Sequence, residues 1–185
     1  MALKTAHLPI SPSKTLLRFA DRIALLGRGL VLDAPCGYGR NAVALASLGC
    51  SVIAIDNNPQ RLRALEHSKA SYISRESRKS GQIATICGDL RSDRWIFAPS
   101  SFSAIICVHF EMIDILLCFI SSLQKGGYIY VESFGGHGHN FRALPKTGEV
   151  RNLLDRNTTL HYYKERRVGP PEFNSVCVTL FGQKC

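Results

Sequence analysis

The sequence predicts an α/β fold, a doubly wound and mostly parallel sheet that ends in an antiparallel hairpin. Short apolar runs alternate with helical patterns up to residue 133, which is typical of parallel strands joined by crossover helices. The connections between these segments are short. Near the end of the chain, two strand-like runs at 158–168 and 174–184 are separated by Gly169-Pro170-Pro171, so we expect them to pair antiparallel.

The first predicted elements are a helix, a strand and a second helix. Residues 13–26 place their apolar side chains on one helical face, and Ser13 is suited to cap that helix. Residues 30–34, LVLDA, form a short buried strand. A helix is expected over 40–48, where Gly49 ends it.

The same alternation continues through the middle of the chain. Further strands are predicted at 51–56, 83–87, 102–108 and 126–133. Helices are predicted from Pro59 to about residue 71 and over 112–123, and proline suits the first helical position. A loop rich in Gly and His follows at 134–145, and then a short helix near 146–154.

The bulk composition predicts one globular domain over 1–185. The chain is 45% hydrophobic and 20% charged, and no stretch rich in Pro, Gly or Ser divides it. Its formal net charge of +9 favours anionic partners. Such partners include nucleic acid and phosphorylated or carboxylated small molecules.

The cysteines and the apolar segments favour a cytoplasmic protein. The seven cysteines are odd in number and form no C-x-x-C pair, which indicates buried free thiols in a reducing compartment. The N-terminus lacks the long apolar region of a signal peptide. The most apolar window, 103–123, is interrupted by Glu111 and Asp114, so a strand followed by a helix explains it better than a membrane span.

A glycine turn after the first strand predicts a ligand site. The stretch from Gly37 to Ala42, GYGRNA, fits the G-x-G-x-x-G/A turn of dinucleotide-binding folds. A dinucleotide would place its pyrophosphate on the helix N-terminus at 39–41, close to the carboxylate of Asp33, at a cost in Coulomb energy. S-adenosylmethionine carries a sulfonium and an amino group but no phosphate, so Asp33 favours it. An NAD-linked oxidoreductase is the disfavoured alternative.

Two more acids follow the next strands. Asp56 ends the second strand, where a carboxylate can accept hydrogen bonds from both hydroxyls of an adenosine ribose. Asp89 follows the third strand and is placed to accept from the adenine amino group. Because the carboxyl ends of parallel strands meet at one edge of the sheet, Asp33, Asp56 and Asp89 together predict a stronger site than the glycine turn does alone.

The chain resembles the class I S-adenosylmethionine-dependent methyltransferases over roughly residues 13–183. The resemblance rests on VLDAPCGYGRNAVALASLG, SVIAIDNNPQRL, CGDL, FSAIICVHF and LQKGGYIYVES, in that order. The phrase GRNAVALASLG is similar to small bacterial methyltransferases of the tellurite-resistance type. The resemblance implies a seven-stranded sheet with an antiparallel C-terminal hairpin. Pro35 is a departure, because the family often has Gly there.

The resemblance also implies that S-adenosyl-L-methionine is the cofactor and that residues at matching positions bind it. These are the acids, the turn glycines and their neighbours at the ends of the first four strands: Asp33, Ala34, Gly37, Gly39, Asp56, Asn57, Asp89, Leu90 and Val108. Arg40 and Asn41 begin the helix after the turn and are either surface residues or ligand contacts.

Methyl transfer needs an aligned nucleophile and, for some acceptors, a general base. His109 ends the fourth strand and Glu132 the fifth, so these are the candidate catalytic residues; the alternatives are a core histidine and a surface acid paired with a lysine. The 134–145 loop, with His137, His139, Asn140 and Arg142, is expected to be a rim over the substrate. Helix 13–26 is expected to form part of a substrate lid. No metal site is predicted.

A small-molecule acceptor is favoured over nucleic acid. Adenine and cytosine amino methyltransferases of this fold resemble one another in an Asn/Asp-Pro-Pro-aromatic motif after the fourth strand, and this chain has Val108-His109-Phe110 there. An RNA or nucleic-acid methyltransferase is the main alternative. A non-catalytic protein that binds an adenosyl ligand is a further one.

Overall fold

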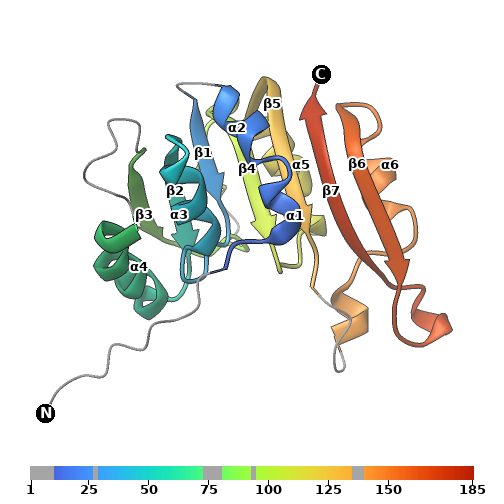
Figure 1. The fold of residues 1–185 in the computed structure, drawn as a ribbon. Coiled ribbons are helices and arrows are strands. Elements are labelled where there is room, and N and C mark those ends of the chain that lie inside the picture. Colours follow the sequence, from blue (N-terminus) through green and yellow to red (C-terminus); the bar gives the residue numbers. More distant parts are fainter. Residues whose placement is uncertain (1–10, 27–28, 73–80, 93–94, 135–139) are drawn as a thin grey trace, which may run out of the picture.

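The sheet has seven strands, as Figure 1 shows. The computed structural model describes residues 11–26, 29–72, 81–92, 95–134 and 140–185. The strand order is β3-β2-β1-β4-β5-β7-β6. The strands are β1 (Leu30–Asp33), β2 (Ser51–Asp56), β3 (Ile83–Cys87), β4 (Phe102–Val108), β5 (Leu123–Glu132), β6 (Thr158–Arg167) and β7 (Val176–Lys184).

The pairing directions confirm the predicted topology. β1 to β5 pair in parallel, and β7 is antiparallel to both of its neighbours, β5 and β6. The antiparallel hairpin therefore closes one end of a parallel sheet. The chain order reverses between β1 and β4, which is where an open α/β sheet leaves a crevice beyond the carboxyl ends of its strands.

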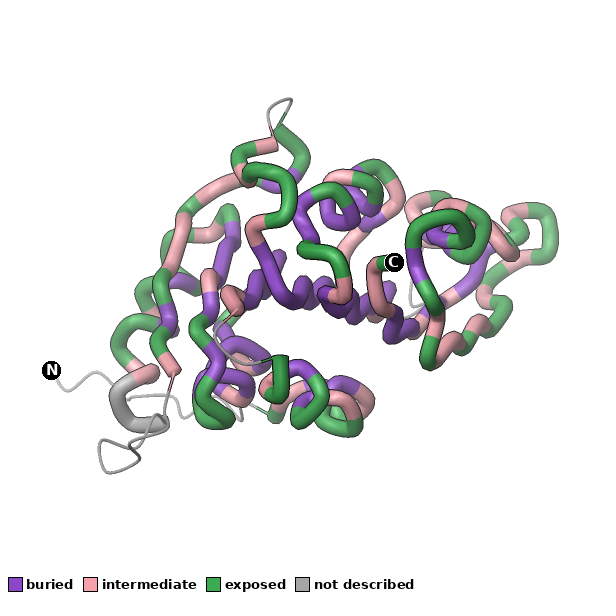
Figure 2. The backbone as a smooth tube through the Cα atoms, turned by 90° about the horizontal axis from the view of Figure 1, so that it is seen from above, coloured by how far each residue is buried: buried purple, intermediate pink, exposed green. Residues whose placement is uncertain are grey.

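Helices cover the two faces of the sheet in separate groups. The apolar core on one face includes residues of α1 (Lys14–Leu17), α2 (Ala20–Leu25), α3 (Arg40–Ser47) and α4 (Pro59–Tyr72). The core on the other face includes residues of α5 (Leu116–Ser122) and α6 (Glu149–Leu154). Figure 2 shows the buried sheet between these two layers.

The central strands are apolar along their whole length because both of their faces are covered. Every residue of β4 is buried, from Phe102 to Val108. The outer strand β6 is largely exposed or half-buried, since it has a neighbour on one side. The contrast explains why the run at 102–108 reads as continuous hydrophobic sequence and the run at 158–167 does not.

The prediction of one helix over 13–26 is wrong in detail. The segment forms two short helices, α1 and α2, and Arg18 and Phe19 separate them. The Phe19 ring stacks on Phe181 of β7, with ring centroids 4.3 Å apart. Tertiary packing of one aromatic side chain on the sheet therefore accompanies the break in a segment whose periodicity favours a single helix.

Several other boundaries differ from the predictions by a few residues. The segment predicted as a helix at 112–123 starts with a 3-10 turn, η1 (Ile113–Ile115), and only then becomes α5. β5 begins at Leu123 and not at 126, because Leu123 already pairs with Phe102 of β4. Short 3-10 turns also form at η2 (Asn140–Ala143) and η3 (Pro171–Phe173).

Candidate active site

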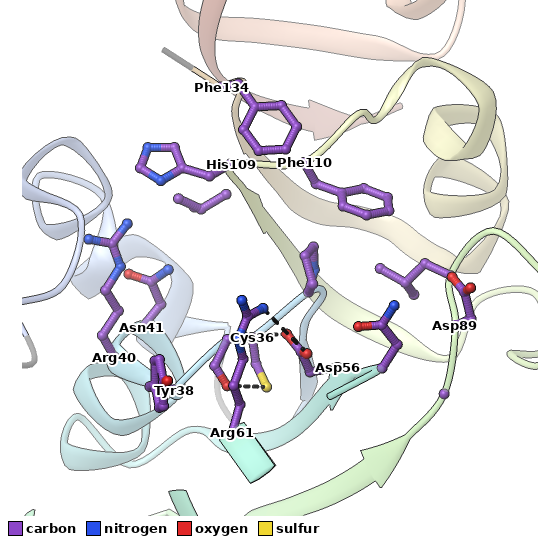
Figure 3. A pocket seen from close by; sticks show the side chains of 16 residues that line it. Cys36, Tyr38, Arg40, Asn41, Asp56, Arg61, Asp89, His109, Phe110 and Phe134 are labelled. Atoms are coloured by element: carbon purple, nitrogen blue, oxygen red, sulfur yellow. Dashed lines mark hydrogen bonds and ion pairs between the residues drawn. The ribbon is translucent and has the colours of Figure 1, made fainter. Parts of the chain in front are cut away.

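A pocket of about 560 Å³ lies at the carboxyl ends of the parallel strands. Figure 3 shows His109, Phe110 and Phe134 on one side of it, across from Tyr38, Asp56 and Arg61. Pockets of this size are typical of small-molecule sites. Of the predicted cofactor residues, the pocket wall includes Gly37, Asp56, Asn57, Asp89, Leu90 and Val108. The wall does not include Asp33, Ala34, Gly39 or Glu132.

The glycine turn forms part of the pocket wall. Gly37 and Gly39 have φ angles of +58° and +78°, in the left-handed region that glycine adopts without strain. A Cβ on Gly39 would lie 2.4 Å from a methyl carbon of Leu65, whereas a Cβ on Gly37 would meet nothing within 4 Å. Gly39 is therefore needed for packing against α4, and Gly37 keeps the pocket side of the turn open.

Asp33 lies beneath this turn. The side chain is fully buried, and Oδ2 accepts a hydrogen bond from the Ala42 N–H at 3.0 Å. Oδ1 has no partner among the described residues. Burial raises the pKa of the Asp33 carboxyl to about 7. The backbone contact is one that a non-functional helix-capping acid would also make, so a role for Asp33 toward the cofactor stays a prediction.

Asp56 is the carboxylate at the centre of the pocket wall. Its side chain is 2% exposed. Oδ1 accepts a hydrogen bond from the Asn58 N–H and Oδ2 accepts one from the Gly37 N–H, each at 2.9 Å. The Arg61 guanidinium lies 3.7 Å from Oδ1. A carboxylate has about four acceptor positions, so Asp56 keeps capacity for a ligand diol. The residue that joins the second strand to the glycine turn is thus also available to a ribose.

Asp89 lies farther out on the same wall. It is exposed, and its Oδ1 accepts from the Arg91 N–H at 2.9 Å. Leu90 beside it is buried and apolar. An exposed carboxylate next to an apolar surface fits an adenine, whose ring packs on the surface while its amino group donates at the edge. The wall from Asp56 to Leu90 fits an adenosyl group.

Several pocket residues were missed or left open by sequence reasoning. Arg40 and Asn41 lie on the pocket wall, and a ligand contact for either residue stays a prediction. Tyr38 and Arg61 also line it, and the Arg61 guanidinium lies 5.9 Å from the centre of the Tyr38 ring. Arg61 comes from α4, and no local motif distinguishes it from Arg63, the other arginine of that helix.

His109 and Glu132 meet at the other end of the pocket. His109 Nε2 lies 3.8 Å from Glu132 Oε1, and the two side chains are 51% and 26% exposed. The His109 N–H also donates to the Glu132 carbonyl at 2.7 Å. His109 has a φ of +56°, which is uncommon for a residue with a side chain. The histidine lines the pocket, and the glutamate lies behind it.

Two buried hydroxyl groups hold Glu132 in place. Its Oε2 accepts from the Ser13 hydroxyl at 2.7 Å and from the Tyr130 hydroxyl at 3.0 Å. Burial raises the pKa of Tyr130, so this phenol remains protonated and donates. Glu132 is therefore not the surface acid of the alternative interpretation, because its partners are hydroxyl groups inside the fold.

The segment before α1 joins the two ends of the pocket. The Ser13 N–H donates to the side-chain oxygen of Asn41 at 3.0 Å, while its hydroxyl reaches Glu132. Arg40 donates to the Ser11 carbonyl at 3.4 Å. The N-terminal segment thus contacts the helix after the glycine turn and the acid behind His109. A role as a substrate lid stays a prediction.

The loop predicted as a substrate rim is only partly described. His137 and His139 lie outside the described residues. Asn140 and Arg142 lie in η2, where the Arg142 guanidinium is 5.6 Å from the centre of the Phe173 ring. Phe134, which precedes the undescribed part, lines the pocket.

Comparison with known proteins identifies the fold family. Residues 31–127 match the family model described as a methyltransferase domain. A ubiquinone biosynthesis O-methyltransferase from Xanthomonas campestris pv. campestris is 31% identical over 156 residues, which cover 79% of this chain and 59% of that protein. The chain thus spans a little over half the length of this curated relative.

Solved structures with the same fold include two methyltransferases. A SAM-dependent methyltransferase from Methanosarcina mazei matches with a TM-score of 0.64 and 18% identity, covering 94% of this chain and 98% of the other. TehB from Haemophilus influenzae matches with a TM-score of 0.64 and 18% identity, covering 91% and 62%. At this identity the matches show a shared fold. Among the described residues no helix is long and apolar enough to cross a membrane.

Proposed function

Because this chain belongs to the class I S-adenosylmethionine-dependent methyltransferases, we propose that its acceptor is a small molecule that binds beside His109, Phe110 and Phe134. One observation carries the proposal: a single pocket joins the adenosyl-binding wall to these three side chains. The size of that pocket suits a small molecule next to the cofactor. The relative from Xanthomonas, named as an O-methyltransferase of ubiquinone biosynthesis, supports a small acceptor.

The cofactor-binding roles follow from position. Asp56 accepts from the ribose hydroxyls, and Asp89 with Leu90 receives the adenine. Gly37, Asn57 and Val108 form the remaining wall. The unpaired buried oxygen of Asp33 favours a cationic group near the glycine turn, since a positive charge compensates a desolvated carboxylate. When bound, S-adenosylmethionine supplies an electrophilic methyl group on a sulfonium.

His109 acts as the general base for an acceptor that carries a proton. Glu132 Oε1 lies 3.8 Å from Nε2 of the imidazole, where its charge favours a proton on that nitrogen. The other ring nitrogen, Nδ1, is then free to accept the acceptor's proton. The acceptor's oxygen, nitrogen or sulfur would bond to the methyl carbon as the sulfonium–carbon bond breaks, and S-adenosylhomocysteine would leave. Phe110 and Phe134 exclude water from the acceptor atom. The assignment makes His109 the catalytic residue and Glu132 the positioning residue.

We propose the cytoplasm as the place of the reaction, and the free thiols support this. All seven cysteines are free in the structure, and a reducing compartment keeps them so. We therefore assign the enzyme to the cytoplasm.

Two experiments test the cofactor and the class of acceptor. Calorimetry with S-adenosylhomocysteine is expected to give a clear isotherm and calorimetry with NAD none. Methyl transfer from labelled S-adenosylmethionine is then measured on phenols, thiols, amines and oxyanions, and on RNA and DNA at low and high salt. We expect turnover of a small molecule at both salt concentrations, because pocket alignment does not depend on phosphate contacts. Salt-resistant methylation of RNA or DNA without small-molecule turnover would favour the nucleic-acid alternative.

A further inference from the structure

The sheet face beside His109 and Glu132 carries basic side chains without ion pairs among the described residues. Glu132 of β5 pairs with Thr179 of β7, and Thr179 pairs with Lys164 of β6. Residues directly opposite each other in antiparallel strands share a face of the sheet. Lys164 therefore projects on the same face as Glu132, two strand spacings or roughly 10 Å away.

A second row connects the same face directly to the pocket. Cys177 of β7 pairs with Arg166 of β6, and the Cys177 thiol donates to the Phe134 carbonyl at 3.0 Å. Phe134 lines the pocket. Phe134 and Cys177 are thus the two residues that link the pocket to Arg166.

Arg18 adds a third cation to the basic surface formed by Lys164 and Arg166. Its guanidinium lies 5.2 Å from the centre of the Tyr162 ring, and Tyr162 is two residues before Lys164 on the same strand. Arg18, Lys164 and Arg166 are all exposed. None of them takes part in the ion pairs formed by the described residues. Figure 1 shows α1 and α2 in front of the middle of the sheet, whereas β6 and β7 carry α6 behind them.

The nearby acids leave this surface positive. Glu165, between the two cations in sequence, faces the opposite side of the sheet, where it accepts from the Gly148 N–H at 3.1 Å and from the Tyr163 hydroxyl at 2.6 Å. Glu132 is occupied by Ser13 and Tyr130 at its Oε2. Asp21 is exposed on α2. The three cations Arg18, Lys164 and Arg166 outnumber these two acids, Glu132 and Asp21, so the surface keeps a positive excess.

We propose that the acceptor carries an anionic group, a carboxylate or a phosphate, which Lys164 and Arg166 bind while the atom to be methylated lies beside His109. The inference rests on the proposed function, a small-molecule acceptor, and adds its charge and its approximate length. Lys164 lies two strand spacings, roughly 10 Å, from Glu132, and the reacting atom lies beside the histidine that Glu132 faces. Positive side chains at this distance also attract the acceptor to the pocket from solution.

The experiment compares charged and neutral forms of one acceptor. 4-Hydroxycinnamic acid and 4-hydroxybenzoic acid are each compared with their primary amides, and 4-hydroxyphenyl phosphate tests the phosphate. The enzyme variant is Lys164→Gln with Arg166→Gln. The matched control is Arg151→Gln with Arg156→Gln, which removes the same charge: both arginines are exposed, and Arg151 lies over the Tyr163 ring on the opposite face. KM, kcat and the S-adenosylhomocysteine affinity are measured at 0.1 M salt.

We expect the longer acid to be preferred over its amide. In the Lys164 and Arg166 variant its KM rises about fivefold or more, as two exposed charge contacts allow. The kcat and the cofactor affinity stay within about twofold, and the control variant keeps the original KM. In ¹H–¹⁵N spectra of the protein with S-adenosylhomocysteine, the amide signals of Lys164 and Arg166 shift with the acid and not with the amide.

Two results overturn the anion site. One is equal KM values for the acid and the amide; the other is equal behaviour of the variant and its control. Turnover of the neutral amide in either case leaves the small-molecule function standing. If no small molecule is methylated while RNA is, the proposed function fails, and the spectra with the acid still decide whether Lys164 and Arg166 bind an anion.

Discussion

The two ends of the pocket are built in different ways. On the cofactor side, Asp33, Asp56 and Asp89 each accept from a backbone N–H that lies no more than nineteen residues away in sequence. On the acceptor side, Glu132 accepts from the side-chain hydroxyls of Tyr130 and Ser13, and Ser13 is 119 residues away. A hydrogen bond from a backbone N–H depends on the shape of the chain at that point. A hydrogen bond from a side chain depends on which residue the fold places nearby. The cofactor side is therefore a property of local motifs and the acceptor side a property of the assembled chain.

The largest expected effect concerns the buried acid of the cofactor side. The pKa of Asp33 is raised from an ordinary 3.8 to about 7, so between these pH values the folded protein keeps a proton that the unfolded chain has released. The free energy of unfolding therefore falls as pH rises through this window. At about 1.4 kcal/mol per pKa unit, the contribution is on the order of 4 kcal/mol.

Urea unfolding at pH 4.5 and 7.5 measures this contribution. We expect Asp33→Asn to lose less stability between the two pH values than the natural protein does. Asp89→Asn is the matched control, because Asp89 is exposed and also accepts from a backbone N–H. An unchanged pH dependence in the Asp33 variant would show that this carboxyl is ionised throughout.

On the acceptor side, His109→Ala is expected to lower kcat by about a hundredfold or more, the loss of a general base. The affinity for S-adenosylhomocysteine should be nearly unchanged, because Asp56 and Asp89 are intact. His67→Ala, an exposed histidine of α4, serves as the control. Kinetics and calorimetry together check the separation of the two sides. A normal kcat in His109→Ala would assign proton removal elsewhere.

The converse change is Asp56→Ala. It should weaken cofactor affinity by about 1.5–3 kcal/mol, the range for a hydrogen bond to a charged group, or roughly ten- to 150-fold. The kcat at saturating cofactor should change far less. Circular dichroism and thermal unfolding show whether loss of the Gly37 contact disturbs the fold. Unchanged affinity for S-adenosylhomocysteine in a folded variant would remove Asp56 from the ribose.

The smallest expected effect comes from removing the hydroxyl groups that donate to Glu132 on the acceptor side. Ser13→Ala and Tyr130→Phe each remove one donor to Glu132, and we expect kcat to fall by roughly tenfold, about 1.4 kcal/mol. Ser13→Thr keeps the hydroxyl and should restore most of the activity, and the His109 ring signals in NMR spectra should shift in the alanine variant. Ser68→Ala, a hydroxyl bonded to the Leu65 carbonyl, is the control. Equal activity of Ser13→Ala and Ser68→Ala would contradict the positioning role.

Sequence reasoning predicted the strands better than the helices on either side of them. The β4 run was recognisable because a strand buried on both faces must be apolar throughout. The break between α1 and α2 was not, because the periodicity of 13–26 is helical and a contact between Phe19 and Phe181, 162 residues apart, was needed to reveal the turn. Arg61 was missed for another reason: it lies only five residues after Asp56, but no local motif distinguishes it from Arg63 of α4.

By itself, the sequence determined the order of strands and helices, the glycine turn, and the acids that end the parallel strands. These are local features, because strand periodicity and left-handed glycines depend on a few neighbouring residues. Only the tertiary structure decided that Asp33 is buried beneath the turn, that Glu132 stands behind His109, and that Ser13 closes the network between them. Those outcomes depend on the sheet order, which brings β5 beside β4 and places the N-terminal segment over both. Burial and side-chain partners are set by such distant neighbours, and no stretch of sequence contains them.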